Sequence, residues 1–238
     1  MKVIQANCRV QFTASDVDFI LGVLGKRSGD AASLVALLAD PETRDLILDD
    51  ELLFRALLEQ GGCLRVSSHL YFYVLVRHVL RRSGLDDRRV ADYVAEMLAE
   101  YSREERAHCV IPGQPGRLQY FFEMLMALEK ADDHTAFFIR AHIGNHSLFL
   151  SGVFPEHILH RATRRGAPGL RYYEGLGRAN YRAASNHRLA AKYDLAAIFD
   201  RLSDQFEPAR RALNDLADRV FSLGDPEVPA HLLNPAGL

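Results

Sequence analysis

Hydrophobic residues recur along most of the chain at the spacing of one helical face. The clearest case is a run of large apolar side chains that follow one another at intervals of three and four: Val90, Tyr93, Val94, Met97, Leu98 and Tyr101. This spacing places them on a single stripe of an α-helix, the side that packs against a protein core. Repeated along the chain, the pattern predicts an all-α fold, a multi-helix bundle of about ten helices.

The first residues follow a different pattern, an alternation of apolar and polar side chains. Its apolar members are Ile4, Ala6, Cys8, Val10 and Phe12. A period of two is typical of a β-strand, so we expect a short extended N-terminal segment. A lone strand leaves its backbone N–H and C=O groups without partners. The segment therefore predicts pairing, either within the chain or with a second copy.

Turn-forming residues divide the helical pattern into regions. The stretch IPGQPG at 111–116 is the strongest internal break, because Gly and Pro disfavour both helix and strand interiors. We expect an N-terminal helical region at 1–112 and a C-terminal helical region at 113–223, packed into the same core or an adjoining one. The proline-rich remainder, 224–238, is expected to be a flexible tail.

Composition narrows the class of protein. Formal net charge is −2 and hydrophobic residues make up 48% of the chain, as in ordinary globular proteins. The three cysteines are far apart and form no CxxC pair, which argues against a disulfide framework and against a cysteine-built zinc site. The most apolar window, 136–154, contains two histidines, an arginine and an asparagine, too polar for a simple membrane span. We expect a cytoplasmic protein without a membrane association.

A helix near the middle of the chain combines apolar and polar residues in an unusual way. Between Asp133 and Ser151 the apolar side chains cover nearly the whole helix circumference, which indicates burial on all sides. Polar side chains carried into the interior need partners, since an unpaired buried polar group costs about 1–3 kcal/mol. We expect one buried polar cluster from this helix and a later one: Arg140, His142, Asn145, His146, Asn180 and His187.

Two of these residues suggest a metal site. His142 and His146 are four apart and share one helical face, a spacing that lets two imidazoles reach one zinc or iron ion. Candidate third ligands are His134, Glu123, His157 and His160. The other interpretation is a hydrogen-bonded network that holds neighbouring helices together. Glu105 and His108 also have the ExxH spacing of di-iron bundles, but no matching pair follows. No other cofactor is predicted.

Charge is distributed unevenly. The stretch from Arg161 to Lys192 is strongly basic, and the stretch from Asp30 to Glu59 is strongly acidic. We regard five arginines as a candidate binding surface for an acidic protein, a phosphate group or a nucleic-acid backbone: Arg164, Arg165, Arg171, Arg178 and Arg182. The last three share one face of the long helix expected at 170–192. Alternatively, they form a solvated face, or pair with acids such as Asp49, Asp50 and Glu51 in the same chain or in another.

The opposite side of this basic helix carries small residues. Gly175 and Gly177 each cost about 1 kcal/mol relative to Ala in a helix, so a packing reason is expected for them. Small residues let another helix approach closely. Gly144, on the polar helix, is the natural counterpart.

Two segments carry a resemblance to a known group of proteins. They are GNHSLFLSGVFPEHI, at 144–158, and RYYEGLGRANYRAAS, at 171–185. Both are similar to an uncharacterised family of bacterial all-helical proteins, and the resemblance covers the C-terminal half. It implies a helical fold and no particular activity.

The chain contains no recognisable catalytic motif. We therefore expect a non-enzymatic interaction or regulatory protein that binds itself, as a homodimer, or another protein. One alternative is a metal-dependent helical-bundle enzyme centred on His142 and His146. A second is anion or nucleic-acid binding through the face that carries Arg171, Arg178 and Arg182.

Overall fold

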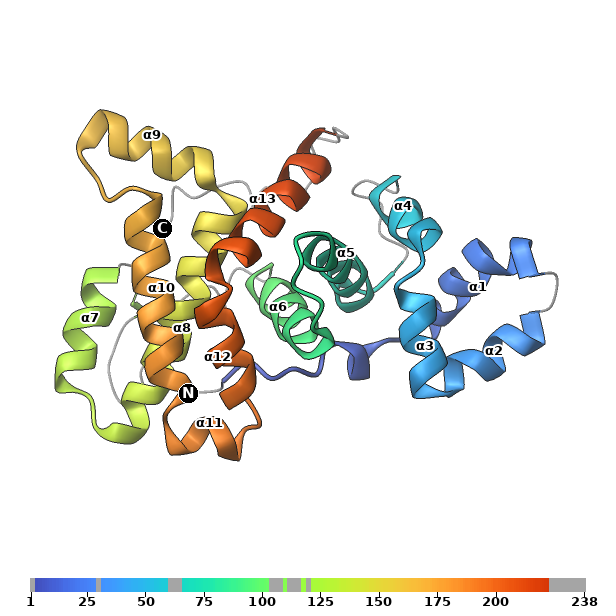
Figure 1. Ribbon diagram of the computed structural model, residues 1–238, viewed down its shortest axis with the longest axis horizontal. Coiled ribbons are helices and arrows are strands. Elements are labelled where there is room, and N and C mark those ends of the chain that lie inside the picture. Colours follow the sequence, from blue (N-terminus) through green and yellow to red (C-terminus); the bar gives the residue numbers. More distant parts are fainter. Residues whose placement is uncertain are drawn as a thin grey trace.

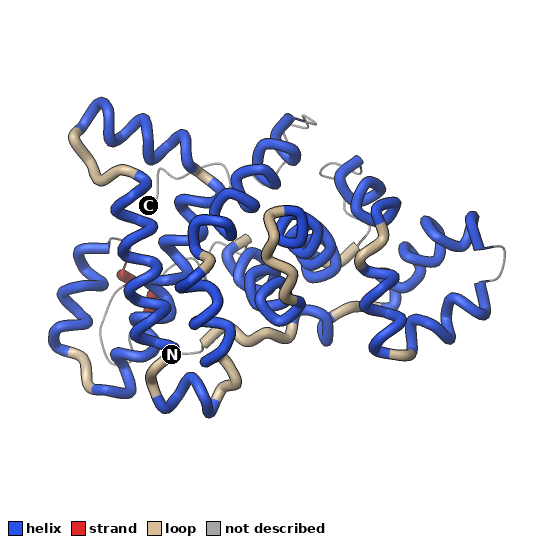
Figure 2. Tube along the Cα trace, in the orientation of Figure 1, coloured by secondary structure: helices blue, strands red, loops and turns tan. Residues whose placement is uncertain are grey.

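Helices make up nearly all of the regular structure in the computed structural model (Figures 1 and 2). The structure describes residues 3–28, 31–59, 66–102, 109–110, 117–118 and 121–222. Within these ranges there are thirteen α-helices, one short 3-10 helix and one pair of two-residue strands. The all-α prediction is confirmed. The helix count exceeds the predicted ten because long patterned stretches are broken; the stretch 170–192, for example, forms two helices.

The N-terminal half consists of a small group of helices beside a central pair. The group contains η1 (Cys8–Gln11), α1 (Ala14–Ser28), α2 (Ala31–Ala39), α3 (Pro41–Leu48) and α4 (Glu51–Glu59). The central pair is α5 (Ser68–Arg82) and α6 (Arg88–Tyr101). Figure 1 shows α1 to α4 at one end of the elongated molecule and the central pair in its middle.

The C-terminal half forms the other end. Its elements are β1 (Cys109–Val110), β2 (Arg117–Leu118), α7 (Phe121–Lys130), α8 (Asp133–Val153), α9 (Pro155–Arg165), α10 (Leu170–Ser185), α11 (Arg188–Lys192), α12 (Ala196–Asp204) and α13 (Phe206–Ser222). Helix α13 packs against both α8 and α5, and so joins the two halves (Figure 1). Buried side chains from both halves belong to one hydrophobic cluster. The predicted boundary at 112–113 lies outside the described residues.

Local capping signals set several helix starts. The side chains of Asp40, Ser67 and Asp132 accept a hydrogen bond from the backbone N–H three residues later. An N-cap of this kind satisfies one of the four N–H groups that a helix start leaves unpaired. Helix α6 is capped by Asp87, whose side chain accepts from the backbone N–H groups of Arg89 and Val90, although Asp86 beside it could also form a cap. The local pattern therefore locates the helix start to within one residue.

The N-terminal segment is not a β-strand in the described residues. Cys8–Gln11 forms a 3-10 turn that lies against α5 and α6 of the same chain. The thiol of Cys8 donates to the carbonyl oxygen of His69 at 3.3 Å, and the backbone N–H of Arg9 donates to Asp92 at 2.9 Å. Side chains and carbonyls of the central helix pair thus provide partners that a strand would need from a sheet. The predicted strand was wrong for this reason.

Helices α8 and α10 approach each other closely at small residues. A Cβ atom added to Gly144 of α8 would lie 2.7 Å from a ring carbon of Tyr181 on α10. A Cβ atom on Gly177 of α10 would overlap the ring of Phe206 and lie 3.0 Å from Ser147 of α8. Both glycines therefore have the packing role that the sequence suggests. Gly175 has none, because nothing lies within 4 Å of its added Cβ.

Candidate functional site

A polar centre lies inside the bundle where α6, α8 and α10 meet. Asn145 of α8 accepts two hydrogen bonds through Oδ1, from the hydroxyl of Tyr93 at 2.8 Å and from that of Tyr181 at 2.7 Å. All three residues are buried. Burial raises the pKa of both tyrosines, so both hydroxyls stay protonated and can donate. The amide thus ties three helices together through one oxygen.

The other residues of the predicted buried cluster are spread along α8, α10 and α11. Asn180 is buried, but its amide donates to the carbonyl of Leu176 within its own helix at 2.9 Å. His187 is half-buried and caps α11, accepting from the N–H of Leu189 at 3.1 Å. Arg140 is also half-buried. Asn180 and His187 thus form these hydrogen bonds within α10 and α11 rather than with Asn145, and a single cluster of the six residues stays a prediction.

His142 and His146 do lie together. Their rings are nearly parallel, with centroids 5.8 Å apart. The hydroxyl of Tyr101 lies 3.3 Å from Nδ1 of His142, and Phe121 packs on His146 at 5.1 Å. His146 is buried and His142 half-buried. The pair therefore sits in an aromatic surrounding at one edge of α8.

The described residues contain no group of three side chains placed to hold a metal ion. Of the candidate third ligands, His134 and His160 are exposed, while His157 lies on α9. Glu105 and His108 lie outside the described residues. The metal site centred on the two imidazoles stays a prediction.

The five predicted binding arginines fall into two groups. Arg182 is engaged within the chain: its guanidinium forms ion pairs with Asp200 and Asp204 of α12. The remaining four are exposed, and no carboxylate in the described part of the chain forms an ion pair with them: Arg164, Arg165, Arg171 and Arg178. The sequence pattern places all five arginines in one predicted surface, but only four of them are without an ion-pair partner among the described residues.

These four arginines belong to α9 and α10. Helix α9 projects from the end of the molecule, with the start of α10 below it (Figure 1). It ends at Gly166, which has the left-handed conformation (φ 63°) that favours glycine. Burial, together with repulsion from Arg161, His160 and Arg165, lowers the pKa of His157 on the same helix. Helix α9 carries Arg161, Arg164 and Arg165 against one acid, Glu156, so its formal charge is positive.

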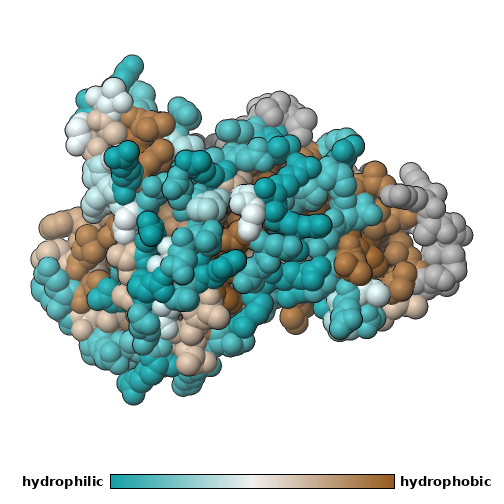
Figure 3. Space-filling model, viewed as in Figure 1, coloured by the Kyte–Doolittle hydropathy of each residue, from teal (hydrophilic) through white to brown (hydrophobic). Residues whose placement is uncertain are grey.

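Apolar groups are interspersed with these charges. Leu159 of α9 is 43% exposed and Tyr172 of α10 is 44% exposed. In the space-filling view, hydrophobic and hydrophilic side chains alternate over the projecting helix (Figure 3). We call the four unpaired arginines with Leu159 and Tyr172 the α9–α10 surface. It combines guanidinium groups, an aromatic ring and an aliphatic side chain.

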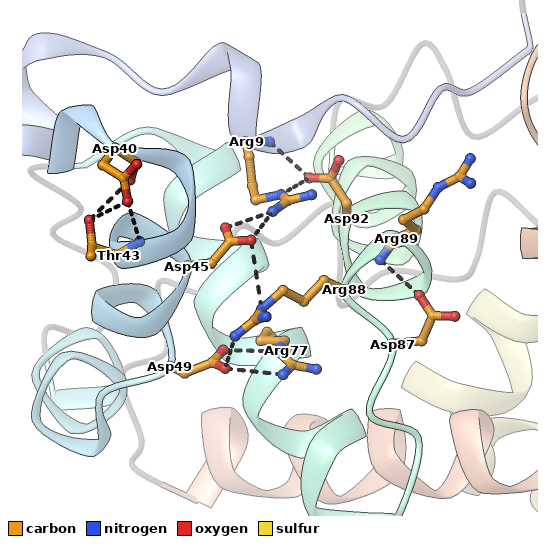
Figure 4. Close-up of polar contacts among 10 residues, drawn as sticks. All are labelled: Arg9, Asp40, Thr43, Asp45, Asp49, Arg77, Asp87, Arg88, Arg89 and Asp92. Atoms are coloured by element: carbon orange, nitrogen blue, oxygen red, sulfur yellow. Dashed lines mark hydrogen bonds and ion pairs between the residues drawn. The ribbon is translucent and has the colours of Figure 1, made fainter. Parts of the chain in front are cut away.

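The sequence analysis missed an ion-pair network between α3, α5, α6 and η1. Arg77 donates to both oxygens of Asp49, at 2.8 and 3.0 Å, and both side chains are over 90% buried. Arg88 reaches the same carboxylate at 3.0 Å and lies 3.7 Å from Asp45. Asp45 in turn accepts from Arg9 at 2.7 Å. Figure 4 shows Arg88 extending between the two carboxylates of α3.

This network corrects one sequence-based interpretation. Within the chain, Asp49 and Glu51 pair with other arginines than those of the basic helix α10, while pairing with a second chain stays a prediction. Asp49 pairs with Arg77 and Arg88, and Glu51 lies 3.2 Å from Arg82. Burial alone would raise the pKa of Asp49, but the hydrogen bonds and charges of Arg77 and Arg88 together lower it, because a bidentate contact of this type favours the ionised carboxylate. The sequence held one signal of this network: Asp45 and Asp49 are four residues apart, the spacing of one helical face.

A second set of ionisable groups is buried under η1. Glu96 lies 3.6 Å from the imidazole of His69 and accepts from the amide of Gln11 at 2.8 Å. Asp92 and Glu96 are almost fully buried. Burial raises the pKa of both carboxyl groups, and it also raises that of the neighbouring Cys8 thiol. A thiol with a raised pKa is a poor nucleophile, which argues against a reactive role for Cys8.

A pocket opens beside the ion-pair network, on the side of α4 and α5. Its volume is about 390 Å³, and it is lined by Asp49, Glu51, His78, Arg81 and Arg82. We call it the α4–α5 pocket. Four of its five lining residues are charged, so it is a polar site.

The comparisons with known proteins give no relative. No protein-family model, no curated protein and no solved structure matches the chain. Among the described helices, none has both the length and the apolar character that crossing a bilayer requires.

Proposed function

We propose that the protein is a binding protein that holds an acidic protein partner on its α9–α10 surface. One observation carries the proposal: Arg164, Arg165, Arg171 and Arg178 are exposed and have no carboxylate partner in the described part of the chain. Elsewhere the arginines are mostly engaged with acids, as Arg77, Arg82 and Arg182 are. Four unpaired guanidinium groups on the successive helices α9 and α10 offer charge complementary to carboxylates.

The residue types around these arginines favour protein over nucleic acid. Leu159 and Tyr172 supply apolar and aromatic area that has no counterpart on a phosphate backbone. Arg and Tyr are enriched at protein interfaces, whereas Lys is depleted. The chain's formal net charge of −2 also gives it no overall attraction to a polyanion. An acidic surface with exposed apolar side chains is therefore the partner that fits best.

The proposal can be tested with a short helical peptide that carries glutamates and leucines together on one helical face. Binding is measured by fluorescence anisotropy, with a duplex DNA as the second probe. We expect the peptide to bind and its affinity to fall with added salt, because exposed charges are screened. Arg171→Ala with Arg178→Ala should weaken binding at least about tenfold, as loss of charge-assisted contacts predicts.

The matched control is Arg211→Ala. Arg211 is equally exposed but lies on α13 and pairs with Glu207, so its loss should leave peptide binding unchanged. Tighter binding of DNA than of peptide would instead favour the hypothesis that the surface binds nucleic acid. Light scattering on the same variants tests the remaining occupant, a second copy of the chain. A dimer that dissociates only in the Arg171 and Arg178 variant would assign the surface to self-association.

A further inference from the structure

The guanidinium groups beside the α4–α5 pocket have hydrogen-bonding capacity that the described residues do not use. Arg81 lies 3.6 Å from Asp49, too far for a hydrogen bond, and donates none to the described residues. Arg82 donates from Nη2 alone, to the two oxygens of Glu51. Both side chains are about half exposed. Several N–H donors therefore remain available to a ligand in the pocket.

The two carboxylates of the pocket already form ion pairs within the chain. Asp49 is contacted by Arg77, Arg88 and Arg81. Glu51 is contacted by Arg55 and Arg82, and by the imidazole of His78 at 2.8 Å. Each acid thus has more than one cationic or donor group around it. Five guanidinium groups contact these two acids, and Asp86 and Asp45 offset two of them, which leaves a formal charge of +1 around the pocket.

Packing fixes the positions of two of the pocket's donors, the side chains of His78 and Arg82. The ring of His78 stacks on Phe54 with centroids 3.9 Å apart. The guanidinium of Arg82 also lies over the Phe54 ring, 5.5 Å from its centroid. Phe54 is itself buried. Arg82 and His78 are thus held by both a ring contact and a shared carboxylate, so little side-chain freedom is lost when a ligand binds.

From these contacts we infer that the α4–α5 pocket binds a small oxyanion ligand, a compound that carries a phosphate or carboxylate group. The planar forks of Arg81 and Arg82 match two oxygens of such a group. The volume of about 390 Å³ suits a small metabolite rather than a macromolecule. The exposed Nη atoms of Arg81 and Arg82 hold the anion, while Asp49 and Glu51 keep the arginines in place.

Inorganic phosphate is the first probe and succinate the second, so that phosphate and carboxylate recognition are distinguished. Calorimetry measures the affinity, and long-range proton–nitrogen NMR of histidine side chains reports the location. We expect millimolar or tighter binding and a shift of the His78 resonance, which a His78→Asn variant assigns. Arg81→Gln should weaken binding at least about tenfold, by loss of a charge-assisted contact. This variant should fold, since Arg81 donates no hydrogen bond within the described residues.

Two control variants separate this pocket from the α9–α10 surface. Arg211→Gln, on α13, and Arg171→Gln, on α10, should both leave the phosphate affinity and the His78 shift unchanged. Absence of any His78 shift at millimolar phosphate and succinate overturns the inference. It is also overturned if Arg171→Gln abolishes binding while Arg81→Gln does not, since the anion would then be on the other surface. Neither result bears on peptide binding at α9–α10.

Discussion

The close approach of α8 and α10 predicts that Gly144→Ala destabilises the protein. The new Cβ would lie 2.7, 2.8 and 3.0 Å from three ring carbons of Tyr181, which is fully buried and cannot swing into solvent. Overpacking of this kind costs about 1–3 kcal/mol. Any ring shift would also lengthen the 2.7 Å hydrogen bond to Asn145, whose loss costs about 1 kcal/mol. Ala recovers about 1 kcal/mol of helix propensity. The net loss should be about 1–3 kcal/mol.

Gly175→Ala is the matched control for this substitution. It makes the same chemical change inside a helix, but at an exposed position where nothing lies within 4 Å of the new Cβ. Only the propensity gain remains, so the variant should be more stable by about 0.5–1 kcal/mol. Urea denaturation at equilibrium measures both changes, with an unchanged slope required for a valid comparison. If Gly144→Ala were as stable as the wild type while Gly175→Ala gained stability, the packing argument would be refuted.

Three further predictions concern buried polar groups. Asn145→Leu leaves two buried phenol hydroxyls without an acceptor, and thermal unfolding should show a loss of about 2–4 kcal/mol. Asp49→Asn leaves the buried guanidinium of Arg77 with the exposed Asp86 as its one remaining charge partner among the described residues; urea denaturation should show a loss of about 1.5–3 kcal/mol, and a loss below about 1 kcal/mol would contradict a structural role for the Arg77–Asp49 pair. Burial raises the pKa of Glu96, so the folded protein binds a proton at this carboxyl more tightly than the unfolded chain does. The protonated carboxyl therefore stabilises the fold fully below the unfolded-state pKa of about 4.3, and this stabilisation is lost as pH rises through the folded-state pKa. Stability curves measured from pH 4 to 8 should therefore show Glu96→Gln gaining on the wild type as pH rises, and parallel curves would refute this.

The sequence was sufficient for features that depend on neighbouring residues. Asp40 followed by Pro41 locates the start of α3, since the cap and the fixed proline angle act within one turn. The apolar periodicity of α8 also predicted its burial, which the structure shows over most of the helix. The N-terminal strand failed because its alternation does not reveal the distant groups that satisfy its backbone. Asp92, which accepts from Arg9, is 83 residues away.

The candidate sites depended more heavily on tertiary contacts. Charge counting found the acidic and basic stretches but could not show which charges pair. Asp49 and Arg77 are 28 residues apart, and nothing in their spacing indicates that they meet. In the same way Arg182 shares a helical face with Arg171 and Arg178, yet α12 brings two aspartates to Arg182 alone. The charged residues available for binding are those that form no ion pair within the fold. Which residues these are depends on tertiary contacts and cannot be found from the sequence pattern.

The two proposed binding sites differ in how firmly their arginines are held, and this difference sets what each can bind. In the α4–α5 pocket, Arg82 is fixed by a carboxylate and an aromatic ring, so a small anion need not order it. On the α9–α10 surface, the four unpaired arginines have no such contacts among the described residues. Ordering each long side chain costs about 0.5–1.5 kcal/mol. A small ion that touches one or two of them cannot offset that cost, whereas a partner that also covers Leu159 and Tyr172 gains apolar burial in compensation. This difference favours a macromolecular partner for the proposed α9–α10 surface and a small ligand for the proposed pocket, where Arg82 is already held.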